Sequence, residues 1–246
     1  MSTAAALVPV MLLFAATIAA SAADAQQPGP TKISKCQAIA QPGSYRLANN
    51  LKAAGNCLVI TARGVTIDLA GFAIVGNGTG TAITAKDAKA GSIPQARTVV
   101  RNGEISNFAS ATDLSGTVEG LRVVSNARGI VVGVGAVRNN IVQFNGSAGI
   151  KIADGIVTGN LLIANDIGIC VEEAGVITGN QAAGNKIGIE VKGTGSTLVG
   201  NIADGNSEIG MRVACPSNRT DNTAIGNPRN LVLKGQACRN DGNLAP

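Results

Sequence analysis

Asparagine recurs about every twenty residues through the second half of the chain, in two parallel rows. The first row comprises Asn102, Asn140, Asn160, Asn180, Asn201 and Asn222, with Leu121 in the remaining place. The second row comprises Asn107, Asn126, Asn145, Asn165, Asn185, Asn206 and Asn227. A repeat of this period indicates one supersecondary unit that is stacked many times. The sequence therefore predicts a solenoid.

Short apolar stretches separate the asparagines. Three successive repeats read GIVTGNLLIANDIGICVEEA, GVITGNQAAGNKIGIEVKGT and STLVGNIADGNSEIGMRVAC. The Gly-Ile-x-Val type of stretch near the end of each repeat alternates as a half-buried strand does. We expect every second residue of these strands to point inward, namely Ile150, Ile152, Ile169, Val171, Ile189, Val191, Met211, Val213, Leu231 and Leu233. Each coil then supplies about three short strands joined by tight bends.

The bends use Asn and Gly because these residues tolerate left-handed backbone angles. A buried Asn amide can also bond to its equivalent in the next coil, which makes a ladder. We expect such ladders from Asn140 to Asn222 in the first row and from Asn145 to Asn227 in the second. At the β spacing of roughly 4.8 Å, about eight or nine coils form a cylinder about 40 Å long. The prediction is an all-β, single-stranded parallel β-solenoid with capped ends.

The start of the chain has the pattern of a secretory signal. Residues 4–20 are almost wholly apolar, and an Ala-x-Ala cleavage pattern ends at Ala25. We predict a signal peptide over 1–25, a linker over 26–35 and one β-helix domain over 36–246. An uncleaved membrane anchor is the alternative interpretation. The protein is then secreted or periplasmic, with no membrane span after cleavage.

Five cysteines are present, and none falls in a CxxC motif. In an oxidising compartment we expect local pairs at the two ends, Cys36 with Cys57 and Cys215 with Cys238. Each bridge contributes about 3 kcal/mol by restricting the unfolded chain. Cys170 is left over. It is a reactive thiol with a pKa lowered by Lys151, an intermolecular disulfide site, or a tolerated small residue half covered by a loop.

The residues at 41–76, QPGSYRLANNLKAAGNCLVITARGVTIDLAGFAIVG, resemble the opening coils of secreted bacterial β-helix proteins. The run from Gly64 to Leu69 and the pair Gly71-Phe72 carry this likeness, and Ala70 stands where Asn is common. The chain thus resembles the pectate-lyase-like superfamily of right-handed parallel β-helix proteins with short β-helix (PbH1) repeats. The resemblance implies a right-handed parallel β-helix. It leaves function open, since this superfamily includes lyases, hydrolases, epimerases, adhesins and scaffolds. Two segments depart from the repeat: 78–96 is expected to form a loop or lateral strand with a protrusion, and the tail from Gln236 is expected to cap the far end.

In enzymes of this superfamily the substrate lies across the outer face of one sheet. The candidate ligand-facing residues on the Gly-Ile-x-Val strands are Lys151, Cys170, Glu172, Glu190, Lys192 and Arg212. We expect Glu172 beside Lys192 and Glu190 beside Arg212, one coil apart. These residues are either ordinary ion pairs on a solvated sheet or a groove that binds the carboxylates of an acidic polysaccharide.

Composition excludes a His-dependent epimerase, and the few aromatic residues offer no extended platform on which sugars could stack. The chain has no His, only 2% aromatic residues and a net charge of +5, which favours polyanionic partners over others. We predict a non-catalytic binding or structural module without catalytic residues, metal site or cofactor, whose partner is an acidic polysaccharide or a cell-envelope protein and not a nucleic acid. The alternative is a polysaccharide-active enzyme, a lyase of uronate polymers that uses calcium. A hydrolase needs two carboxylates that face one bond, and Glu172 and Glu190 each have a basic partner instead.

Overall fold

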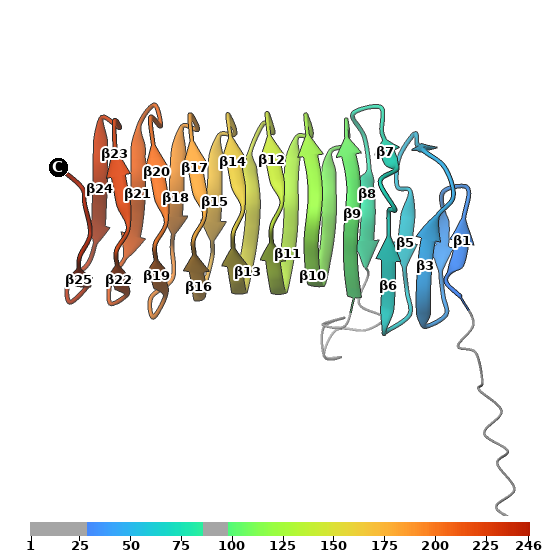
Figure 1. Cartoon of the computed structure of the whole chain (residues 1–246), viewed down its shortest axis with the longest axis horizontal. Helices are drawn as coiled ribbons and strands as arrows, with labels where there is room; N and C mark the ends of the chain where they lie inside the picture. The colour runs from blue at the N-terminus through green and yellow to red at the C-terminus, as the bar shows by residue number, and fades with distance from the viewer. Residues whose placement is uncertain (1–28, 86–97) are drawn as a thin grey trace, which may run out of the picture.

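The computed structural model describes residues 29–85 and 98–246, and every regular element in them is a β-strand. The strands pair in parallel with the equivalent strand of the next coil. The result is a right-handed parallel β-helix of about ten turns, stacked in a row from β1 (Thr31–Ile33) to β25 (Arg239–Asp241) (Figure 1). The predicted fold class is confirmed, with slightly more coils than the eight or nine expected, because the first three coils carry no Asn rows.

Each coil contributes one strand to each of three faces, which we call faces A, B and C. Face A contains β2 (Gln37–Ile39), β5 (Leu58–Ile60), β8 (Thr81–Ala85), the first parts of β10 (Ser110–Val124), β11 (Arg128–Arg138) and β13 (Ala148–Thr158), then β15 (Ile167–Val171), β18 (Ile187–Val191), β21 (Ile209–Ala214) and β24 (Arg229–Lys234).

Face B follows face A along the chain. It contains β1 (Thr31–Ile33), β3 (Gly43–Leu47), β6 (Val65–Asp68), the first part of β9 (Thr98–Ser106), the middle of β10, the last parts of β11 and β13, then β16 (Gly175–Thr178), β19 (Thr197–Val199), β22 (Asn218–Thr220) and β25 (Arg239–Asp241). The first strand of the solenoid, β1, therefore lies inside the segment 26–35 that the sequence suggests as a linker.

Face C closes each coil. It contains β4 (Leu51–Lys52), β7 (Ala73–Val75), the last parts of β9 and β10, then β12 (Ile141–Gln143), β14 (Leu161–Ile163), β17 (Gln181–Ala183), β20 (Ile202–Asp204) and β23 (Thr223–Ile225). Of the segment 78–96, β8 is a regular face A strand, and residues 86–97 lie outside the described part of the chain.

The core is a narrow column of aliphatic side chains inside the coils. The inward residues predicted from Ile150 to Val213 are at most 2% exposed. The prediction is wrong for Leu233, which is 43% exposed although it pairs with Val213. Its strand belongs to the last coil, so no further coil covers its inward side.

Asparagine side chains link the coils at two bends. Asn160, for example, donates from Nδ2 to Asn180 Oδ1 at 2.9 Å, and Asn145 does the same to Asn165 Oδ1. The first row also includes Asn243, to which Asn222 donates at 2.8 Å. Asn102 and Asn107, in contrast, are exposed and lie outside the ladders. Their ladder places are taken by Gly103, which pairs with Leu121, and by Phe108, whose backbone N–H donates to Asn126 Oδ1.

Disulfides close both ends of the solenoid, as predicted. Cys36 is bonded to Cys57 and Cys215 to Cys238, at Cα–Cα distances of 4.4 and 5.0 Å. Two such bonds fit a protein of the periplasm or the extracellular space. The described residues contain no helix long and apolar enough to cross a membrane. The predicted signal peptide, 1–25, lies outside the described residues.

Candidate functional site

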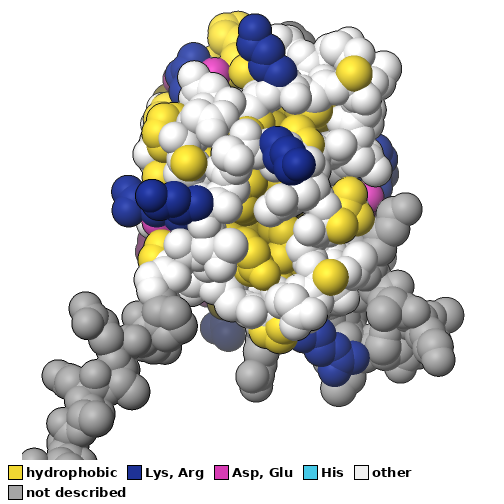
Figure 2. Space-filling view, turned by 90° about the vertical axis from the view of Figure 1, so that its right-hand side faces the viewer, with side chains coloured by type: hydrophobic (Ala, Val, Ile, Leu, Met, Phe, Trp, Pro, Cys, Tyr) yellow, Lys and Arg dark blue, Asp and Glu magenta, His cyan; other side chains and the backbone are white. Residues whose placement is uncertain are grey.

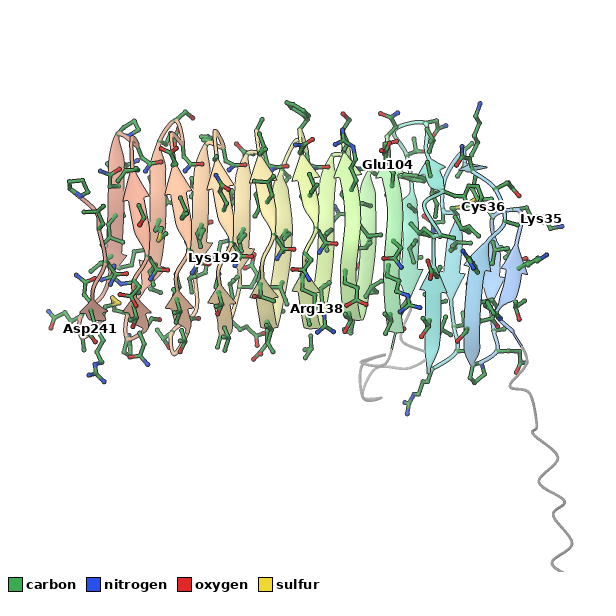
Figure 3. All side chains as sticks on the ribbon, in the orientation of Figure 1. Lys35, Cys36, Glu104, Arg138, Lys192 and Asp241 are labelled. Atoms are coloured by element: carbon green, nitrogen blue, oxygen red, sulfur yellow. A yellow bond between two sulfur atoms is a disulfide. The ribbon has the colours of Figure 1, made fainter. Side chains whose placement is uncertain are left out.

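The outward column at the centre of face A has the register expected from the sequence. Strand pairing places six residues in consecutive coils: Val131, Lys151, Cys170, Glu190, Arg212 and Val232. Glu172 and Lys192 follow two residues later on their coils, so they extend outward from the same face. The fold therefore brings together the six candidate residues, Lys151, Cys170, Glu172, Glu190, Lys192 and Arg212, in the C-terminal half of the solenoid (Figure 3, where Lys192 is labelled).

Two ion-pair groups occupy this face. Glu172 Oε1 lies 3.0 Å from Lys151 Nζ and 3.1 Å from Lys192 Nζ, so one carboxylate bridges two ammonium groups. Arg212 Nη1 donates to Glu190 Oε1 at 2.6 Å. The lysine side chains are about half exposed, whereas the Glu190 side chain is 8% exposed. Three cations and two carboxylates leave this cluster with a net positive charge.

Cys170 lies under this cluster and is 2% exposed. Its thiol donates to Glu172 Oε1 across 3.4 Å. Burial raises the pKa of Cys170 to about 11, and the attraction of Lys192 only partly opposes this. The suggestion that Lys151 lowers the pKa of this thiol is therefore wrong, because desolvation is the larger effect. At neutral pH the group is a neutral, covered thiol.

Two charges of the cluster, those of Glu172 and Lys192, are fixed at neutral pH. The hydrogen bonds from Lys151 and Lys192 lower the pKa of Glu172 to about 2, so the carboxyl group is ionised. The hydrogen bond to Glu172 raises the pKa of Lys192, so the amine is protonated. A general acid or base requires a pKa near the working pH. Neither Glu172 nor Lys192 meets that requirement.

The low pKa of Glu172 predicts an acid-sensitive contribution to stability. In the unfolded chain a Glu titrates near pH 4.3. Between that pH and about 2 the folded state therefore binds fewer protons at this position than the unfolded state. The contribution of Glu172 to the free energy of unfolding is lost as the pH falls through this window. Glu172→Gln should lower the free energy of unfolding by about 1 kcal/mol at neutral pH, since half-exposed partners are screened by solvent. Urea titrations should show this difference shrinking towards pH 2. A difference that is independent of pH would contradict the assignment.

A groove lies beside the cluster, at the corner between faces A and B. It has a volume of about 310 Å³ and is lined by Asp154, Gly155, Ile156, Ala174, Gly175, Val176, Gly195 and Thr197. Glycine is required in its floor: a Cβ on Gly155, at φ +137°, would lie 2.0 Å from the carbonyl oxygen of Gly135. Ile156 and Val176 are exposed at 48% and 45%. Our sequence reasoning missed this groove, although its glycines recur with the period of the coils.

A second cavity lies on face B of the first coils. It has a volume of about 290 Å³ and is lined by Pro30, Ser44, Tyr45, Arg46, Thr66, Asp68 and Arg101. Arg101 Nε lies 3.4 Å from Asp68 Oδ2, so these two charges are paired. Within the described ranges no three His, Cys, Asp or Glu residues are grouped closely enough to hold a metal ion.

Comparison with known proteins gives a structural match. The enzymatically active domain of tailspike protein 2 from bacteriophage CBA120 superposes with a TM-score of 0.56 at 14% sequence identity, over 82% of this chain and 42% of that one. The chain described here is therefore a right-handed parallel β-helix protein. The full-length tailspike protein 2 from an Escherichia coli O157:H7 bacteriophage matches at 14% identity with a TM-score of 0.47, over 82% of this chain and 38% of that one. No protein-family model matches the chain, and no curated protein matches its sequence.

This β-helix protein spans less than half the length of the tailspike chains that it matches. At this level of identity the likeness concerns the fold alone. The parallel β-helix supports many activities and several inert roles, so function has to be argued from the residues of the site.

Proposed function

We propose that the protein is an extracytoplasmic, non-catalytic module that binds an acidic polysaccharide along face A and the adjoining groove. The observation that carries the proposal is the pair Lys151 and Lys192, which share the single carboxylate Glu172. An ammonium group has three N–H donors, and Glu172 accepts only one from each lysine. Both side chains are about half exposed, so their remaining donors can reach the carboxylates of a ligand.

These cations form one concentrated patch of positive charge on face A. The backbones of Lys151 and Lys192 are two coils apart, roughly 10 Å at the β spacing, but their ammonium groups converge on Glu172 Oε1, at 3.0 and 3.1 Å. The groove beside them has the size of a small ligand site. Exposed Ile156 and Val176 can pack against the C–H faces of sugar rings, and Asp154 and Thr197 can accept or donate hydrogen bonds to hydroxyl groups.

The same residues argue for binding without turnover. A lyase must remove a proton next to a carboxylate with a base that is neutral at the working pH. Lys192 is held protonated by its hydrogen bond to Glu172, and Cys170 is covered and neutral. Glu190 is bound by Arg212 and almost fully buried. No specific observation favours the alternative of a uronate-polymer lyase.

Proton NMR of pectate and alginate, incubated with the full chain and calcium, tests the proposal. We expect the polymer signals to broaden without new signals from unsaturated or epimerised sugars. The double variant Lys151→Gln/Lys192→Gln should weaken binding about tenfold, since a partly exposed charge contributes up to about 1 kcal/mol.

A matched control removes two exposed lysines that lie on faces B and C, in the variant Lys32→Gln/Lys52→Gln, which changes the net charge equally. Weakening of the same size in both variants would show that only net charge matters. New unsaturated sugar signals would show that the protein is an enzyme and contradict the proposal.

A further inference from the structure

The net positive charge of the chain lies in its first coils. Residues 29–67 contain five basic residues and no acidic residue, so the basic and acidic residues of the rest of the chain are equal in number and the net charge of +5 belongs to this segment. The five residues are Lys32, Lys35, Arg46, Lys52 and Arg63, and all of them are exposed. None of them forms an ion pair with another residue in 29–85 or 98–246. The charged residues of the later coils, in contrast, are commonly paired.

These cations surround one end of the solenoid. Lys32 and Arg46 are adjacent and face outward on face B. Lys52 belongs to face C, and Arg63 lies in the bend between faces A and B. In the view onto this end, Lys and Arg side chains lie around and over the end, and hydrophobic side chains are visible at its centre (Figure 2). The end is therefore a small surface with positive charge distributed around it.

We propose that this end docks onto the anionic surface of a lipid bilayer, with the solenoid axis pointing away from it. The coils that carry the five cations lie within roughly 10 Å of one another along the axis, which is close to the Debye length at physiological salt. A flat anionic surface can therefore attract all five at once. A thread-like polyanion that runs along one side would meet only the cations of that side.

The position of the surface in the chain supports a bilayer as the partner. If the apolar segment 4–20 is retained as a membrane anchor, the alternative to a cleaved signal peptide, it holds this end close to a bilayer, because it ends only a short distance before Pro30. The two disulfides fit a compartment outside the cytoplasm. Docking by this end would leave the cluster around Lys192 free on the side of the solenoid, so the inference does not depend on the proposed polysaccharide binding.

Vesicle cosedimentation of the full chain tests the inference. The probe is phosphatidylcholine vesicles with and without phosphatidylglycerol, and the measured quantity is the ratio of the two partition coefficients. Binding by the apolar segment 4–20 does not depend on lipid charge, so it contributes equally to both partition coefficients and cancels in their ratio. The triple variant Lys32→Gln/Lys35→Gln/Lys52→Gln should lower the ratio on the order of 100-fold, because a basic residue near an anionic surface contributes about 1 kcal/mol.

The matched control is Arg128→Gln/Arg229→Gln/Lys234→Gln, which removes three exposed cations from later coils. We expect it to leave the ratio nearly unchanged, and thermal melts should show that both variants are folded. An equal decrease of the partition ratio in the two variants would overturn the inference in favour of a general charge effect. An unchanged ratio in the first variant, together with lost binding to soluble pectate, would overturn it in favour of a polymer site at this end.

Discussion

Replacing Asn180 by alanine should lower the free energy of unfolding by about 4 kcal/mol, because the ladder loses several buried hydrogen bonds together. The Asn180 side chain donates to Val157 O at 2.8 Å and to Asn201 Oδ1 at 2.9 Å. Its Oδ1 accepts from the backbone N–H and the Nδ2 of Asn160, at 3.0 and 2.9 Å. Alanine leaves these groups buried without partners. The measurement is urea unfolding followed by circular dichroism.

The neighbouring residue offers a matched control for this experiment. Gln181 is exposed on face C, and Gln181→Ala should change the free energy of unfolding by less than about 0.5 kcal/mol. Similar losses in the two variants would show that the asparagine ladder contributes no more than a surface residue. The same experiment at Asn165 should repeat the Asn180 result, because its side chain has equivalent partners in the second row.

Replacing Arg219 by leucine should instead stabilise the protein, by about 3 kcal/mol. Strand pairing places Arg219 next to Leu198 in the inward column of face B, whose earlier members are Val137, Val157 and Ile177. Arg219 is 2% exposed, and its Nε and Nη2 have no hydrogen-bond partner among the described residues. Burial lowers the pKa of the guanidinium, which reflects the cost of keeping its charge away from water.

A second arginine provides the opposite expectation. Arg212 pairs with the buried carboxylate of Glu190, so Arg212→Leu leaves that charge without a partner and should destabilise the protein by about 3 kcal/mol. The melting temperatures of Arg219→Leu and Arg212→Leu should therefore shift in opposite directions relative to the unmodified protein. Destabilisation by Arg219→Leu would show that the guanidinium has a favourable partner, and it would contradict our account of this position.

Several features could be predicted from the sequence because they repeat. The recurrence of Asn fixes the stacking, since only equivalent bends can pair their amides. Alternation along the Gly-Ile-x-Val strands predicts which side chains face inward, because successive residues of a strand point to opposite sides. The positions of Cys36 and Cys57 at one end, and of Cys215 and Cys238 at the other, allowed the disulfides to be paired.

Position along the axis was less predictable, because the coils differ in length. The separation between ladder partners grows from 18 residues, between Phe108 and Asn126, to 21 residues, between Asn206 and Asn227. A constant spacing of about twenty therefore misplaced Asn102 and Asn107 by one residue, which turns their side chains to the solvent. Such a shift can be detected only from the strand pairing.

The sequence alone determined the architecture and the register of face A, because both depend on a local pattern that every coil repeats. It also determined the disulfide pairs, because the four bonded cysteines stand in two pairs near the two ends of the domain. The tertiary structure decided the chemistry of the candidate site. Cys170 and Glu190 are buried although they point outward, because long side chains from adjacent coils cover them. The protonation of Lys192 and the groove beside it likewise depend on contacts between coils, and no single repeat contains those contacts.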